Sequence, residues 1–172
     1  RGAPLADTTR RMDVAINNPP AGSRGPVATR DPEEGRRAME ITAFGAFLRG
    51  RAAAGRMLEQ DPANGARGTI LFTGASAGVK GFPQSASFAM GKFAQRGLAE
   101  SMARELHPQG VHVAWVNIDG GISNTARAER TDDGSDKMLD PDAIADAYLG
   151  LMDQHRSTWS NEIALRPWVE RF

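Results

Sequence analysis

The stretch Thr69-Ile-Leu-Phe-Thr-Gly-Ala-Ser-Ala-Gly78 decides the fold class of this 172-residue chain. Five residues with mostly apolar or β-branched side chains come first, and a loop of small residues follows at once. A short apolar run with such a boundary is typical of a strand buried on both faces. A long helical pattern over Ser85–Leu106 and a second apolar run, Val111–Ile118, come next. The stretch therefore predicts a strand–helix–strand unit with parallel strands.

The same alternation continues on both sides of this unit. Further strands are predicted at Met12–Asn17 and Asn161–Leu165, and further helices at 31–60 and 140–154. Each of these helices begins with an Asp-Pro pair, which is a strong helix start. The segment 119–137 is polar and reads as an irregular excursion. We therefore predict an α/β fold, a Rossmann-like doubly wound parallel sheet with helices on both faces.

Composition narrows the function classes. The formal net charge is zero, which gives no reason to expect a nucleic-acid or anionic-membrane partner. No apolar run approaches the roughly 18–20 residues that span a bilayer. The chain has no cysteine, so disulfides, thiolate metal sites and Cys nucleophiles are excluded, and we expect no metal. We expect a cytoplasmic location, and a chain that begins mid-gene because its first residue is Arg1.

Three predicted loops follow the carboxyl ends of strands, where ligands of open parallel sheets bind. They span 17–21, 74–81 and 119–125, and all are rich in Gly, Asn, Ser or Pro. Such residues let a backbone approach a ligand closely. Each loop alone is more often only a tight strand-to-helix turn.

Phe88 and Lys92 lie four residues apart near the start of the long predicted helix, so they share one face. A lysine that faces the strand ends can bind ribose hydroxyls or change the pKa of a neighbour. The alternative is a solvated lysine, because Lys92 begins a polar stripe that continues at a spacing of four through Arg96 to Arg104. The residues alone leave both interpretations open.

Several motifs together resemble the second half of the short-chain dehydrogenase/reductase (SDR) family, in the family's order and over essentially the whole chain. They are the stretch 69–78, Phe88-Ala-Met-Gly-Lys92, Leu98–Leu106, Gly110–Asn117, and Asp13-Val-Ala-Ile-Asn-Asn18, which resembles the family's Asn-Asn-Ala-Gly strand. The closing Arg166-Pro-Trp-Val-Glu-Arg-Phe172 is similar to the tail of a bacterial subgroup with Phe in place of the catalytic Tyr. The resemblance implies one partial NAD(P)-binding Rossmann domain over residues 1–172. The family's first three strands and its Gly-rich turn are missing from it.

SDR enzymes transfer a hydride between a nicotinamide cofactor and a carbonyl or alcohol, and the resemblance assigns four positions to that chemistry. In the family a Tyr exchanges the proton, and a Lys four residues later lowers its pKa and holds the nicotinamide ribose. A Ser thirteen residues before the Tyr polarises the carbonyl, and an Asn in the preceding helix orders a relay water. Here the corresponding residues are Phe88, the retained Lys92, Ala75 (with Ser76 beside it) and Thr42. Only one of the four catalytic residue types remains, and we do not expect Tyr148, the only tyrosine, to substitute.

The cofactor motifs also depart from the family pattern. Asn-Asn-Ala-Gly becomes Asn17-Asn-Pro-Pro20, which removes two backbone donors. The family's Pro-Gly-x-x-x-Thr becomes Asp119-Gly-Gly-Ile-Ser-Asn124, with Asn124 at the Thr position. By resemblance, NAD or NADP would contact Asn18, Lys92, Ile122, Asn124 and Thr125. Because no Gly-x-x-x-Gly-x-Gly turn follows a strand, we expect no cofactor binding and no turnover by this chain alone.

Three functions remain open. The first is an NAD(P)-dependent SDR oxidoreductase with a degenerate active site and a small-molecule substrate. The second is a non-catalytic relative or fragment that acts as a binding or oligomerisation subunit, and the third is a Tyr-independent enoyl-type reductase. We also expect a homo-oligomer through the two long helices, unless their apolar residues all pack inward. Those residues are Phe44, Phe47, Leu48, Phe93, Leu98 and Met102.

Overall fold

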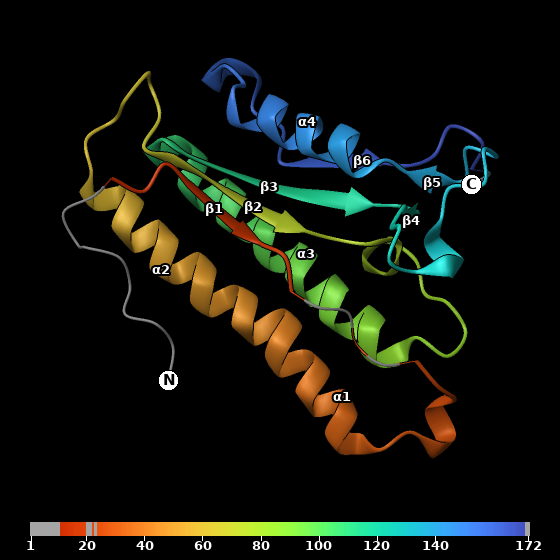
Figure 1. The fold of residues 1–172 in the computed structure, drawn as a ribbon. Helices are drawn as coiled ribbons and strands as arrows, with labels where there is room; N and C mark the ends of the chain where they lie inside the picture. The colour runs from red at the N-terminus through yellow and green to blue at the C-terminus, as the bar shows by residue number, and fades with distance from the viewer. Residues whose placement is uncertain (1–10, 20–21, 23, 171–172) are drawn as a thin grey trace.

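The computed structural model describes residues 11–19, 22 and 24–170. Its centre is a parallel four-stranded sheet in the order β1-β2-β3-β6 (Figure 1). The strands are β1 (Val14–Asn17), β2 (Gly68–Thr73), β3 (Val111–Ile118) and β6 (Glu162–Leu165). The four predicted strands and their parallel pairing are confirmed, and with them the α/β Rossmann-like fold class.

Helices cover both faces of this sheet, as predicted. On one face lie α2 (Gly45–Glu59) and α3 (Ala86–Leu106), with α1 (Pro32–Met39) packed against α3. On the other face lies α4 (Pro141–Met152). The Asp31 carboxylate caps α1 by accepting from the Glu33 amide, and Asp140 caps α4 in the same way. Short 3₁₀ turns complete the chain: η1 (Val27–Thr29), η3 (Ser76–Gly78), η4 (His107–Gln109), η5 (Ala128–Arg130) and η6 (Arg156–Thr158).

The core has two halves, one on each side of the sheet. All eight residues of β3 are buried, as its nearly continuous apolar sequence predicts. Trp115 and Phe72 face α2 and α3, whereas Leu71 and Val116 face Tyr148 and its neighbours on α4. Alternate residues of one strand therefore divide between the two halves.

The predicted helix from Asp31 to about Gln60 is confirmed in its extent, but its middle is π-helical and not α-helical. A π-helical segment, η2 (Glu40–Phe44), separates α1 from α2. Thr42 in this segment is buried against α3 at Gly91, where an added Cβ would lie 2.9 Å from the Thr42 Cβ. The absence of a side chain at Gly91 thus allows the two helices to approach closely at this point.

The predicted irregular segment 119–137 contains regular structure at its start. β4 (Gly121–Ile122) pairs in parallel with β5 (Met138–Leu139), and the Ser123 amide extends the pairing by donating to the Leu139 carbonyl at 2.9 Å. The sequence pattern did not predict this pairing, because two-residue strands carry no periodicity of their own.

The small-residue loop after β2 is required by Trp115. A Cβ at Gly74 would lie 2.2 Å from the indole ring, and one at Gly78 would lie 2.5 Å from it. Larger residues at either position would force the buried indole out of place. Packing of the loop on a core tryptophan therefore explains these two glycines.

Candidate functional site

The carboxyl ends of β1, β2 and β3 lie at one edge of the sheet, as parallel pairing requires (Figure 1). The loops that leave this edge begin at Asn18, Gly74 and Asp119. The start of α3 lies beside them, because its first turns pack on η3. The structure therefore brings the sequence-predicted loops and the Phe88–Lys92 turn to one part of the molecule.

Lys92 lies inside this region and is not solvated. Its side chain is only 3% exposed, and Nζ donates a hydrogen bond to the Thr73 carbonyl at the end of β2, at 2.7 Å. No carboxylate among the described residues pairs with it, and burial lowers the pKa of its ammonium to about 8. The alternative of a lysine in a solvated polar stripe is therefore wrong. Arg96, the next residue of that stripe, forms a two-pronged ion pair with Glu162 on β6.

The two positions at which the family has a tyrosine and a serine hydroxyl are Phe88 and Ala75 in this chain, and neither side chain has a hydroxyl. Phe88 lies one turn before Lys92, is partly buried, and has Gly22 packed against its backbone. Ala75 is half-buried in extended backbone at the start of η3. The neighbouring Ser76 is also half-buried, and its hydroxyl makes no hydrogen bond within the described part of the chain.

Thr42 is the remaining position of the predicted catalytic set. It is 2% exposed and touches Gly91, the residue next to Lys92. π-Helical segments within α-helices occur often at functional sites. The structure thus brings Thr42 to the Lys92 turn, although 50 positions separate the two residues in sequence.

Asn17 and Asn18, at the end of β1, differ in burial. Asn18 is exposed, whereas Asn17 is buried and accepts a hydrogen bond from Arg49 Nη1 at 3.0 Å. The buried Nδ2 of Asn17 has no hydrogen-bond partner among the described residues. Pro19 comes next and is buried.

The predicted carboxamide-binding residues lie in the loop after β3. Ile122 belongs to β4 and is 36% exposed, and both Asn124 and Thr125 are exposed. Asn124 Oδ1 accepts from the Ala126 amide at 2.8 Å, so this side chain already shapes its own loop.

Sequence reasoning missed a buried carboxylate at the same edge. Asp119 is 5% exposed and lies 3.2 Å from Arg166, which follows β6, and 3.8 Å from Lys80, which lies beyond η3. The Asp119 carboxylate therefore links the loops that follow β2, β3 and β6. Its signal in the sequence was a charge directly after a buried strand, at the place of the family's proline.

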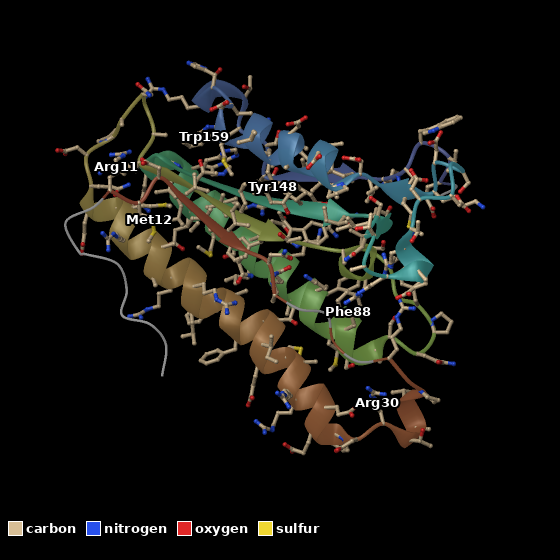
Figure 2. All side chains as sticks on the ribbon, in the orientation of Figure 1. Arg11, Met12, Arg30, Phe88, Tyr148 and Trp159 are labelled. Atoms are coloured by element: carbon tan, nitrogen blue, oxygen red, sulfur yellow. The ribbon has the colours of Figure 1, made fainter. Side chains whose placement is uncertain are left out.

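Sequence reasoning also missed Thr73 and its contact with Tyr148, although Tyr148 does not substitute for the missing tyrosine, as expected. The Thr73 hydroxyl lies 2.7 Å from the Tyr148 hydroxyl, and Tyr148 is 8% exposed. Figure 2 shows that Tyr148 on α4 and Phe88 on α3 lie on opposite sides of the sheet. Tyr148 therefore contacts the end of β2 from the face of the sheet opposite to Phe88, and it does not occupy the position of Phe88.

Other kinds of site find less support in the described residues. No three His, Asp or Glu side chains among them gather in a way that could hold a metal ion. No helix within residues 11–19, 22 and 24–170 is long and apolar enough to cross a membrane. Two hollows of about 310 and 480 Å³ lie at the opposite edge of the sheet, around Gly65, Gly110 and Arg156.

Comparisons with known proteins agree with this architecture. The model of the short chain dehydrogenase family matches residues 3–135. Trans-4-hydroxycyclohexanecarboxylate dehydrogenase of Sinomonas cyclohexanicum is 34% identical over 106 residues, which are 62% of this chain and 39% of that protein. The chain thus spans well under two thirds of this curated relative.

Solved structures extend the match to nearly the whole chain. A short-chain dehydrogenase from Rhodopseudomonas palustris is 34% identical, with a TM-score of 0.76 over 95% of this chain and 66% of that one. A metagenomic short-chain oxidoreductase in complex with NADP is 27% identical, with a TM-score of 0.69 over 93% of this chain and 63% of that one. The sheet order, the strand-end lysine and these matches lead to one conclusion: the chain belongs to the short-chain dehydrogenase family.

Proposed function

We propose that this chain is the C-terminal part of an NAD(P)-dependent oxidoreductase that keeps its cofactor lysine but lacks the usual proton-donating tyrosine. Burial of Lys92 without a carboxylate carries the proposal, because it disfavours the charged ammonium and so destabilises the fold. A buried methionine or leucine would avoid that cost. A charged group kept at such a place, beside the strand ends, is a candidate for function.

The residues at this edge fit the nicotinamide half of a dinucleotide. Lys92 Nζ has three protons and donates one to Thr73, so it can also donate to ribose hydroxyls. Asn18, Asn124 and Thr125 add exposed polar groups, and Ile122 adds an apolar contact. The bound nicotinamide would supply or accept the hydride. The related metagenomic oxidoreductase is known as an NADP complex, which supports the same cofactor class here.

The chain's own residues leave the proton step to another group. Phe88 and Ala75 have no exchangeable side-chain proton, and Thr42 is shorter than the asparagine that it replaces. This favours a second candidate function, the reduction of a conjugated C=C bond. There the hydride adds to the β-carbon and the resulting enolate takes its proton from water or another acid.

The cradle for the pyrophosphate is not among the described residues. β1 is the outer strand of the described sheet, and its Ile16 is 50% exposed. Both observations support the proposal that residues 1–172 form one partial domain. Further strands and the Gly-rich turn of a longer protein would complete it beside β1.

The test is calorimetric titration with NADH and NADPH. The 172-residue chain should show no micromolar binding, and the protein extended upstream to its start codon should bind. Lys92→Met in the extended protein should weaken binding roughly 10- to 100-fold, the usual effect of losing a charged hydrogen bond. Lys137→Met, at an exposed lysine, is the matched control and should bind as the wild type does.

Four results decide between the functions. Equal binding by the Lys92→Met variant, or micromolar binding by the 172-residue chain, contradicts the proposal. No binding by the extended protein supports the non-catalytic subunit instead. If the extended protein binds and reduces enones but not ketones, the Tyr-independent reductase is correct.

The proposed homo-oligomer rests on an exposed apolar patch on the helices. Phe44, Phe47, Leu48 and Phe93 are 44–56% exposed, so the alternative that all six predicted residues pack inward is wrong. The prediction is corrected for Leu98 and Met102, because both side chains are partly buried against the core and do not belong to the exposed patch. The four exposed residues lie on α2, α3 and the end of η2, where a second copy could bury them.

The double substitution Phe47→Glu and Phe93→Glu should convert the oligomer to a monomer, as measured by sedimentation velocity. The two charges would otherwise be buried and unpaired in the interface, which is strongly unfavourable. Leu149→Glu is the control, because Leu149 is 55% exposed on the opposite face of the sheet. A wild-type monomer, or an oligomer that survives both charges, would contradict this interface.

A further inference from the structure

Two helices on opposite faces of the sheet meet the same residue, Thr73. From α3, Lys92 Nζ donates to the Thr73 carbonyl oxygen at 2.7 Å. From α4, the Tyr148 hydroxyl lies 2.7 Å from Thr73 Oγ1. Lys92 and Tyr148 are both buried, at 3% and 8% exposure. Thr73 thus connects the only tyrosine in the sequence to the buried Lys92.

The strand pairing explains why the Thr73 carbonyl is open to a side chain. The Gly74 amide donates to the Val116 carbonyl on β3, so the Thr73 carbonyl, in the same trans peptide unit, points the other way, toward β1. β1 ends at Asn17, which pairs with Phe72. In the register set by the Thr69 amide and the Asp13 carbonyl, the next backbone donor for Thr73 would come from position 19. That residue is Pro19, which has no N–H.

The other side of Thr73 is fixed by the pleat of the strand. Thr73 shares a face with Leu71, two residues before it, and Leu71 packs in the core half that contains Tyr148 and Leu151. The hydroxyl pair therefore closes the end of that core half. It ties the last residue of β2 to the middle of α4.

We propose that Tyr148 is a positioning residue of the Lys92 site, acting through Thr73: its hydroxyl holds the last residue of β2 so that the carbonyl left without a donor by Pro19 receives the Lys92 ammonium. The importance of this arrangement for cofactor binding rests on the proposed function. The positioning itself is a property of the chain without cofactor, and it is measured separately.

The readout is the titration of Lys92, followed by NMR of the lysine side-chain Nζ and Cε in labelled protein. The chain has only three lysines, so Lys80→Arg and Lys137→Arg assign the signals. A carbonyl that accepts from the ammonium stabilises its charged form. Tyr148→Phe should therefore lower the pKa of Lys92 by roughly half a unit, as a partial loss of one such hydrogen bond.

Two variants at the connecting residue sharpen the test. Thr73→Val lacks the hydroxyl and should lower the Lys92 pKa as Tyr148→Phe does, and the double variant should add little. Thr73→Ser keeps the hydroxyl and should titrate as the wild type does. Leu151→Ala is the matched control on α4, since it removes buried apolar contact and should lower thermal stability without moving the Lys92 titration.

The outcomes separate the two proposals. If Tyr148→Phe lowers only the melting temperature and leaves the Lys92 pKa unchanged, Tyr148 is merely structural and the inference is overturned. An equal pKa change in Leu151→Ala overturns it as well. If the pKa moves as expected while the extended protein binds no nucleotide, the positioning stands and the proposed function fails.

Discussion

Lys92→Met should stabilise this protein by about 2 kcal/mol at pH 7, as expected where a functional group is kept at a cost in stability. The pKa of Lys92 falls from 10.5 to about 8 on burial. Each pKa unit corresponds to about 1.4 kcal/mol, so holding the ammonium in the fold costs about 3 kcal/mol at pH 7. Methionine removes that cost and fills a similar volume. Part of the gain is offset, because the Thr73 carbonyl loses its donor.

The wild-type protein should also gain stability as the pH rises from 7 to 10. Between about pH 8 and pH 10.5 the unfolded chain holds the Lys92 proton and the folded chain does not, so the free energy of unfolding increases with pH. The gain up to pH 10 should be roughly 2–3 kcal/mol. Tyr148 acts in the opposite direction only above pH 10, because burial raises its pKa. His112 acts only below about pH 6.5, because burial lowers its pKa.

Urea unfolding at pH 7, 8, 9 and 10 measures both effects. The Lys92→Met variant should lack most of the wild-type increase, and Lys137→Met should keep it. Parallel pH profiles for the wild type and Lys92→Met would show that Lys92 titrates at its ordinary pKa. The charge would then be freely solvated, and the main support for the proposed function would be lost.

The fold could be predicted because its determinants are local. β3 is an eight-residue, nearly continuous apolar run, and Asp31 and Asp140 are N-caps followed by proline. Each pattern constrains its own segment, and right-handed parallel crossovers then leave few arrangements. The π segment at Thr42 was missed because the periodicity of the helix does not reveal it, nor does it reveal the contact that Thr42 makes with Gly91.

The site was only partly predictable because its contacts join distant residues. The spacing of four to Arg96 made Lys92 look solvated, and only its contact with the Thr73 carbonyl shows that it is buried. Pro19 was recognised as a lost donor, but the residue deprived of that donor follows from the register between β1 and β2. Tyr148 and Asp119 likewise act across the sheet, on Thr73 and Arg166.

Restoring the family's two hydroxyls should have the largest effect on activity. In an extended protein that binds cofactor, Phe88→Tyr combined with Ala75→Ser should raise ketone reduction by about 10²–10⁴-fold, the usual contribution of a positioned general acid. The tyrosine would lie one turn before Lys92, as in the family motif, and the nearby ammonium would favour its ionised form. The serine would add a donor to the carbonyl oxygen.

The design of this reversion separates chemistry from folding. Each single variant should recover less than the pair, because residues that act as a unit are not additive. Leu149→Tyr adds a hydroxyl at an exposed position on the opposite face of the sheet and should have no effect on ketone reduction. Lys92→Met in the reverted background should abolish the gain, since the tyrosine then loses the cation that lowers its pKa.

If the reverted protein binds cofactor but gains no ketone reduction, the Lys92 site does not support acid catalysis at position 88. The chain would then be either a Tyr-independent reductase or a binding subunit, and the enone assay decides which.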